Sequence, residues 1–158
     1  MARITQPVEA RLLAEYLAAA YPGYRTLQHT RVGPLHPELD LPYLTPDERR
    51  MVGVWRRWVD AVIVRDRDVL LVEASVLPRP AAVAQLEVYL RLWPRTPEYP
   101  DLTRLPARGL LVSACDDPEI RMLCRARDYL NVVYRPRWVD AYLATLAPRQ
   151  RRPPLAVP

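Results

Sequence analysis

The chain has 158 residues, enough for one domain with a sizeable apolar core. Half of the residues are hydrophobic and 26% are charged, as in an ordinary globular protein, and no apolar run approaches the roughly 18 residues of a membrane span. The formal net charge of +5 permits binding to a polyanion but does not require it.

The composition is unusual in the kind of basic residue that it uses. The chain contains no lysine, so all 23 basic residues are arginine, and it contains 18 prolines. This composition indicates a GC-rich genome, and the proline content fits a thermophile, although thermophiles do not usually lack lysine. Cys115 and Cys124 have no metal-site partners at suitable spacing, and without a secretory signal they indicate a reduced, cytoplasmic setting.

The first third of the chain predicts a helix, a strand and a connection. A helix is expected from Thr5 to Ala20, since proline and an acid lie in its first turn. A half-buried strand follows at residues 24–32, and residues 34–44 form a Pro-rich connection. The segment Thr45-Pro46-Asp47-Glu48 has the pattern of a capping box and opens a short helix.

The Pro-rich connection contains a group of residues that could be drawn as metal ligands, namely His36-Pro37-Glu38-Leu39-Asp40. Pro37 forces an extended loop there, and zinc sites usually have more closely spaced histidines or cysteines. A solvated loop is therefore the favoured interpretation.

Two β-branched apolar runs joined by four charged residues predict a β-hairpin. Its strands are expected at Val52–Val64 and Val69–Ser75. If the turn is centred between them, the numbers of paired residues add to 133, and Asp60 faces Glu73 with Cβ atoms about 4.5–5.5 Å apart. Two acids at that distance repel each other unless a positive charge lies between them, and a divalent cation is the obvious candidate. A one-residue slip in register would separate the two acids.

The segment before Asp60 reads Trp55-Arg56-Arg57-Trp58 and interleaves basic and aromatic residues. A nucleic-acid groove uses guanidinium groups for phosphates and indole faces for bases. The alternative is that both tryptophans pack against the sheet while the arginines lie at its edge, and this is the favoured interpretation.

The second half of the chain predicts alternating helices and strands. After a break at residues 77–80, a helix is expected at residues 81–93, where Gln85 and Tyr89 project one turn apart from one face. A Pro-rich loop at residues 94–108 precedes the remaining elements. These are a buried strand at 109–114, a helix from Asp116-Asp117 to about Leu130, a strand at 132–134 and a helix at 138–146. The two acids that open the second of these helices could bind a metal, but an acidic helix cap explains them more simply.

Four positions of the chain together resemble the PD-(D/E)XK nuclease family, and within it the RecB-like branch. Asp60 corresponds to the metal-binding Asp, Glu73 to the Glu of Glu-x-Lys, and Gln85 and Tyr89 to Gln-x-x-x-Tyr. The chain departs from the family at Ser75, where the family has the lysine that orients the attacking water. Arginine cannot accept a proton at ordinary pH, so this chain has no substitute base of the usual kind.

The resemblance implies an α/β fold with a restriction-endonuclease-like core, in which a mixed central sheet is flanked by helices. It implies a Mg²⁺ or Mn²⁺ ion held by Asp60, Glu73 and the carbonyl of Ala74. It also places the first helix beside the site, where Glu9 or Glu15 could add a carboxylate, although a solvated helix face is the simpler role for both. Residues 1–147 are expected to form the single domain and residues 148–158 a basic, Pro-rich tail.

Three functions remain open. The first is a nuclease-fold protein with a degenerate site, serving as a non-catalytic part of a phage or DNA-processing assembly in the cytoplasm or in a phage particle. Its partners would be DNA, and proteins that bind the tail and the loop at 94–108. The second is an active Mg²⁺- or Mn²⁺-dependent DNA nuclease in which Arg79 or Arg91 replaces the missing lysine. The third is an unrelated α/β protein in which the hairpin acids are coincidental.

Overall fold

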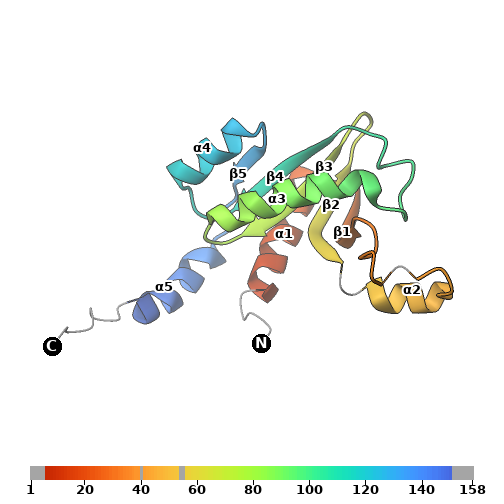
Figure 1. Ribbon diagram of the computed structural model, residues 1–158. Helices are drawn as coiled ribbons and strands as arrows, with labels where there is room; N and C mark the ends of the chain where they lie inside the picture. Colours follow the sequence, from red (N-terminus) through yellow and green to blue (C-terminus); the bar gives the residue numbers. More distant parts are fainter. Residues whose placement is uncertain (1–5, 40, 54–55, 151–158) are drawn as a thin grey trace.

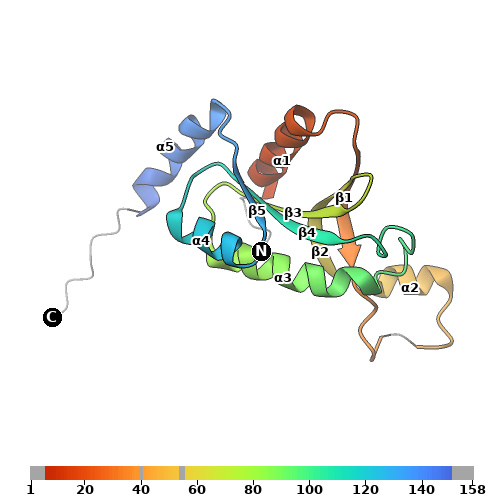
Figure 2. The same ribbon diagram turned by 90° about the horizontal axis from the view of Figure 1, so that it is seen from above.

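The computed structural model describes residues 6–39, 41–53 and 56–150. It contains a five-stranded sheet of order β1-β2-β3-β4-β5, in which the first three strands are antiparallel and the last two pairs are parallel. Helices α3 and α4 cover one face of this sheet and α1 covers the other (Figures 1 and 2). The predicted α/β class, a mixed central sheet flanked by helices, is confirmed.

The elements alternate along the chain in nearly the predicted order. The strands are β1 (Arg25–Val32), β2 (Arg57–Val64), β3 (Val69–Ser75), β4 (Ala107–Ser113) and β5 (Leu130–Val133). The helices are α1 (Gln6–Ala20), α2 (Pro46–Val52), α3 (Pro80–Leu92), the 3₁₀ turn η2 (Trp93–Arg95), α4 (Pro118–Ala126) and α5 (Trp138–Gln150). None of the described helices has the length and apolar character needed to cross a bilayer.

The hairpin of β2 and β3 has the predicted register. Ala61 pairs with Val72 and Val64 with Val69, so the numbers of paired residues add to 133. The turn is closed by a backbone hydrogen bond of 3.0 Å from the N–H of Arg65 to the carbonyl of Asp68. The side chains of Arg65 and Asp68 also form an ion pair across the turn. The charged residues therefore fix the length of the turn, and the turn fixes the register.

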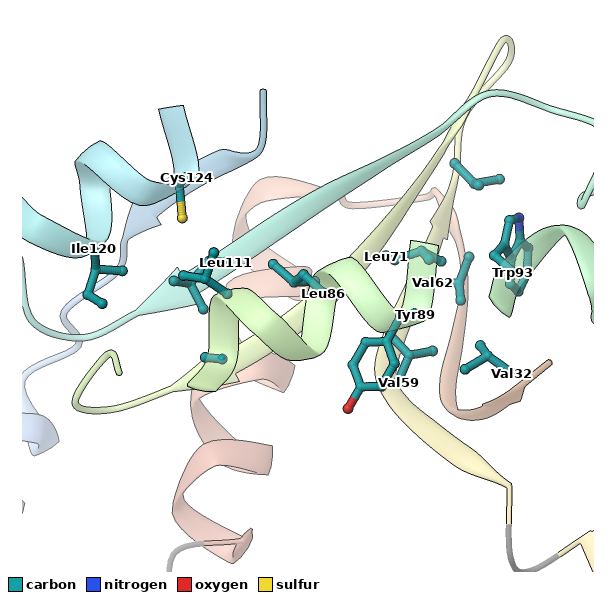
Figure 3. Close-up of a cluster of buried hydrophobic side chains, with 13 residues drawn as sticks. Val32, Val59, Val62, Leu71, Leu86, Tyr89, Trp93, Leu111, Ile120 and Cys124 are labelled. Atoms are coloured by element: carbon teal, nitrogen blue, oxygen red, sulfur yellow. The ribbon is translucent and has the colours of Figure 1, made fainter. Parts of the chain in front are cut away.

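The apolar core is divided by the sheet. On one face, Leu86 and Trp93 from the α3 segment pack with Leu71 and Leu111 from the strands (Figure 3). On the other face, the apolar side of α1 packs against the alternate strand residues, which are those that point away from α3. Side chains alternate between these two faces along β3, whereas Val59 and Val62 of β2 both pack in the cluster beneath α3.

The helix starts follow the capping signals in the sequence. Thr45 and Glu48 form the predicted capping box at α2, with the Glu48 N–H donating to Oγ1 of Thr45 at 3.3 Å. The side chain of Asp117 accepts hydrogen bonds from the first N–H groups of α4. Asp117 is therefore a helix cap, as favoured above, and Asp116 pairs with Arg121.

Several boundaries differ from the prediction. The long strand predicted from Val52 begins only at Arg57, because α2 continues to Val52 and Gly53 caps it. The helix predicted to reach Leu130 ends at Ala126, because the backbone of Asp128 is left-handed (φ 56°) and reverses the chain. The next strand consequently begins at 130 rather than 132, and α5 continues to residue 150, beyond the predicted end at 146.

Candidate functional site

Asp60 and Glu73 lie where the hairpin ladder ends. The last backbone pair of β2 and β3 is Ala61 with Val72, and Asp60 and Glu73 are the next residues outward on each strand. Beyond this pair, Oδ2 of Asp60 accepts a 2.9 Å hydrogen bond from the N–H of Ala74. A side-chain carboxylate thus takes the place of a strand carbonyl, and this bond fixes Asp60 beside the backbone of β3.

Burial dominates the electrostatics of Glu73. Loss of solvent, followed by the charges of Asp60 and Glu9, raises the pKa of Glu73 to about 9, and a hydrogen bond with Tyr89 opposes this shift. Its Oε2 atom is buried and has no hydrogen-bond partner among the described residues. A buried carboxyl group with an unsatisfied oxygen is stable if it is protonated or if a cation neutralises it.

Asp60 is in a similar environment but has more compensation. Burial raises its pKa, whereas the hydrogen bond from the Ala74 N–H and the charge of His29 lower it. His29 lies opposite Asp60 in the numbering of the β1–β2 ladder, between the pairs Gln28–Ala61 and Thr30–Val59. His29, Asp60 and Ala74 therefore bring together β1, β2 and β3 at one point of the sheet.

Tyr89 of α3 is affected by the charges of both acids. The residue is buried, and its pKa is raised by burial, by Glu73 and by Asp60. Figure 3 shows its ring beside Val59, with the hydroxyl directed away from the apolar cluster. Gln85 lies one turn earlier on the same helix and is exposed. Both acids act on Tyr89 by charge, whereas Gln85 is exposed to solvent.

Ser75 does not turn its hydroxyl toward an open site. Its Oγ donates a 2.8 Å hydrogen bond to the carbonyl of Leu77, two residues further along the chain. The position where the resembled family has a lysine therefore carries a small neutral group that is already satisfied by the backbone.

Arg57 belongs to the basic and aromatic segment that the sequence marked before Asp60, and its positive charge lies near the site. Its charge lowers the pKa of Tyr89, against the larger effects of burial and the two acids. Arg57 and Val59 project from one face of β2 because they are two residues apart, and Val59 packs in the cluster that contains Tyr89. The signal in the sequence was its place three residues before Asp60.

The two arginines proposed as lysine substitutes are placed differently. Arg91 pairs with Glu87 at 2.6 Å, and its side chain is 76% exposed. Arg79 is exposed at the residue that precedes α3. Neither contributes to the pKa shifts of Asp60, Glu73 or Tyr89, in contrast to Arg57.

The two acids of α1 also separate. Glu15 is held by Arg11 at 2.8 Å and by the indole N–H of Trp138 at 2.9 Å, so it joins α1 to α5. Glu9 acts on Glu73 by charge and raises its pKa. Of the two acids of α1, Glu9 is therefore the one whose charge acts on the candidate site.

The residues present fit a hard divalent cation in a limited way. Two carboxylates and the predicted Ala74 carbonyl are oxygen donors, which Mg²⁺ and Mn²⁺ prefer, and the unsatisfied Oε2 of Glu73 needs a partner. Among the described residues, no group of three or more His, Cys, Asp or Glu side chains could hold a metal ion. Mg²⁺ sites commonly combine one or two carboxylates with water and a substrate phosphate. Asp60 and Glu73 are sufficient for a site of that kind.

The remaining predicted positions lie away from such a site. In the loop, Nδ1 of His36 accepts a hydrogen bond from the N–H of Glu38 at 3.3 Å, while Asp40 lies outside the described residues. Trp55 also lies outside them. Arg56 forms a two-fold ion pair with Glu98 and its side chain is only 5% exposed, so it does not present its charge to a phosphate.

Comparisons with known proteins add little. No protein-family model matches the chain, and no curated protein matches it. Among solved structures, it is similar to the crystal structure of a repair endonuclease from Pyrococcus abyssi, with 14% sequence identity and a TM-score of 0.48. The match covers 80% of this chain and 46% of that one, so the chain spans less than half the length of the protein that it matches. A similarity of this size assigns neither an activity nor a site residue to the present chain.

Proposed function

We propose that this protein binds nucleic acid and a divalent cation at a degenerate nuclease-like site and serves as a non-catalytic part of a larger DNA-processing or phage assembly. The observation that carries the proposal is the contrast between two neighbouring features. The half-buried pair Asp60 and Glu73 retains an unsatisfied carboxylate oxygen that a cation would neutralise, whereas the Ser75 hydroxyl is neutral and bonded to Leu77. A site of this kind keeps the means to hold a phosphate and loses the means to activate water.

In this proposal the residues have separate roles. Asp60, Glu73 and the carbonyl of Ala74 would hold Mg²⁺ or Mn²⁺, which when bound supplies positive charge for a phosphate oxygen. Tyr89 would orient the Glu73 carboxyl group from α3. Arg57 supplies a further positive charge beside Tyr89. Gln85, exposed on the same helix, would contact the bound strand.

The partners follow from charge and composition. The net charge of +5, carried entirely by arginine, favours a polyanion such as DNA. The Pro-rich loop at 94–108 and the arginine- and proline-rich residues 148–158 would bind protein partners of the assembly.

An active Mg²⁺- or Mn²⁺-dependent nuclease is a second candidate, and one observation favours it. The charge of Arg57 acts on the Tyr89 end of the site, so a guanidinium could stabilise transition-state charge where lysine is missing. This candidate assigns to Arg57 the role that the sequence had suggested for Arg79 or Arg91.

We expect the protein to bind short DNA with an affinity that falls at least about tenfold between about 50 mM and about 200 mM salt, because phosphate contacts release counterions. Fluorescence anisotropy of labelled single-stranded and duplex DNA measures this. No cleavage is expected with Mg²⁺ or Mn²⁺.

Two results would contradict this expectation. An affinity independent of salt would leave protein partners as the plausible ligands. Cleavage that appears with Mn²⁺ and disappears in Glu73→Gln would establish the second candidate instead.

A further inference from the structure

A pocket opens at the edge of the sheet, along the strand β1 that pairs with the strand carrying Asp60. It has a volume of about 390 Å³ and is lined by residues 27–31 of β1, by Trp58 of β2 and by Glu98 and Tyr99 of the loop after η2. We call it the β1-edge pocket. Ligand pockets commonly have volumes of about 300–1,000 Å³, so this one accommodates a single ring system rather than a large ligand.

One wall of the β1-edge pocket is an aromatic side chain held by a cation. Trp58 is 42% exposed although it lies within a strand, and the guanidinium of Arg31 lies 4.7 Å from the centre of its ring. Gly53 makes room for this guanidinium, because a Cβ atom at that position would be 2.9 Å from Nη1 of Arg31. The indole is therefore held in a defined position while much of its surface remains open, as in a stacking platform.

A second wall carries a fixed carboxylate. Both oxygens of Glu98 accept hydrogen bonds from Arg56, whose guanidinium is buried behind them. A carboxylate has about four acceptor positions, so positions remain for N–H donors of a ligand. The edge of a nucleobase offers such donors, whereas a phosphate does not and would be repelled.

The floor of the β1-edge pocket connects it to the acids. His29 lines the pocket, and its charge acts on Asp60. Its backbone is left-handed (φ 45°), a conformation that is uncommon for a residue other than glycine. Trp58 is two residues from Asp60 on β2, a separation of about 6.6 Å along a strand. A ligand in this pocket therefore lies next to the cation site at Asp60 and Glu73 that would bind its phosphate.

We propose that the β1-edge pocket holds one unpaired base of a nucleic-acid strand whose phosphate contacts the cation that Asp60 and Glu73 would hold. The base stacks on Trp58 and directs its N–H donors toward Glu98. This proposal rests on the proposed function and adds that the protein selects single-stranded over fully paired nucleic acid. Single-stranded DNA and single-stranded RNA share this chemistry, because both present unpaired bases.

The test compares the wild-type protein with three variants on labelled single-stranded DNA, single-stranded RNA and duplex DNA by fluorescence anisotropy. Trp58→Ala is expected to weaken binding to the single strands about tenfold, because stacking of one base accounts for a loss of that size. Trp58→Phe should retain most of the affinity, since it keeps an aromatic face. Tyr24→Ala removes an exposed aromatic residue near the other end of β1 and should leave the affinity unchanged.

Single strands with one abasic position locate the effect. The wild-type protein should lose affinity when the missing base is the one that enters the pocket, and Trp58→Ala should not distinguish that strand from the intact one. Equal loss in both proteins, or wild-type affinity of Trp58→Ala for every strand, would overturn the pocket while leaving the proposed function intact. Failure of the wild-type protein to bind any nucleic acid would overturn both.

Discussion

Replacing Ser75 by lysine is expected to create a metal-dependent nuclease. The resembled family has lysine at this position, and side-chain alternation places residue 75 on the same face of β3 as Glu73. An ammonium group there would stabilise transition-state charge and lower the raised pKa of Glu73. Loss of one such electrostatic contact costs about 10²- to 10³-fold in rate, so its gain should raise cleavage of DNA in Mn²⁺ by about 100-fold or more. A gel assay of plasmid nicking measures this.

Two variants control for the side effects of the lysine. Ser75→Met has a similar length and no charge, so it should remain inactive even though it also breaks the bond to Leu77. Ser75→Lys combined with Glu73→Gln should also be inactive, because the cation site is lost. Cleavage by Ser75→Met, or no cleavage by a folded Ser75→Lys protein, would show that the missing charge is not what separates this site from an active one.

Glu73→Gln is expected to make the cation-free protein more stable at alkaline pH. The pKa of Glu73 is raised from an ordinary value of 4.5 to about 9, so the folded protein holds a proton that the unfolded chain releases between these pH values. The stability of the wild-type protein therefore falls as the pH rises through this window. Glutamine stays neutral, and its advantage in free energy of unfolding should grow from near zero at about pH 5 to a few kcal/mol at about pH 9.

Urea unfolding in the presence of a chelator, repeated across this pH range, measures the difference. Glu87→Gln removes a carboxylate on α3 that pairs with Arg91 and is partly exposed. Its effect should stay within about 1 kcal/mol at every pH. A difference between wild type and Glu73→Gln that does not change with pH would mean that Glu73 is ionised in the folded protein without a cation.

The hairpin could be predicted because its sequence constrains it twice. The four charged residues at 65–68 set the turn length, and the apolar alternation on each side sets the faces, so the pairing of Ala61 with Val72 followed. Proline and acidic residues likewise marked the starts of α2 and α4. These signals are local, and the structure confirms them.

The features that could not be predicted depend on contacts between distant segments. The β1-edge pocket joins residues 27–31 with Trp58 and with Glu98 and Tyr99, and no local pattern connects them. No local pattern marks the left-handed backbone of His29, although histidine adopts this conformation more often than most residues other than glycine. The start of β2 at Arg57 was missed because the apolar and aromatic residues before it suit a strand as well as the end of a helix.

The central claim is that Asp60 and Glu73 share one cation-binding pocket, and a crystal of the protein grown with Mn²⁺ tests it most directly. An anomalous difference peak is expected within about 2.0–2.6 Å of a carboxylate oxygen from each residue. A crystal of the Glu73→Gln variant grown in the same way should lack the peak. A wild-type crystal with no peak at this pair, or with the two carboxyl groups turned to opposite faces of the sheet, would contradict the claim.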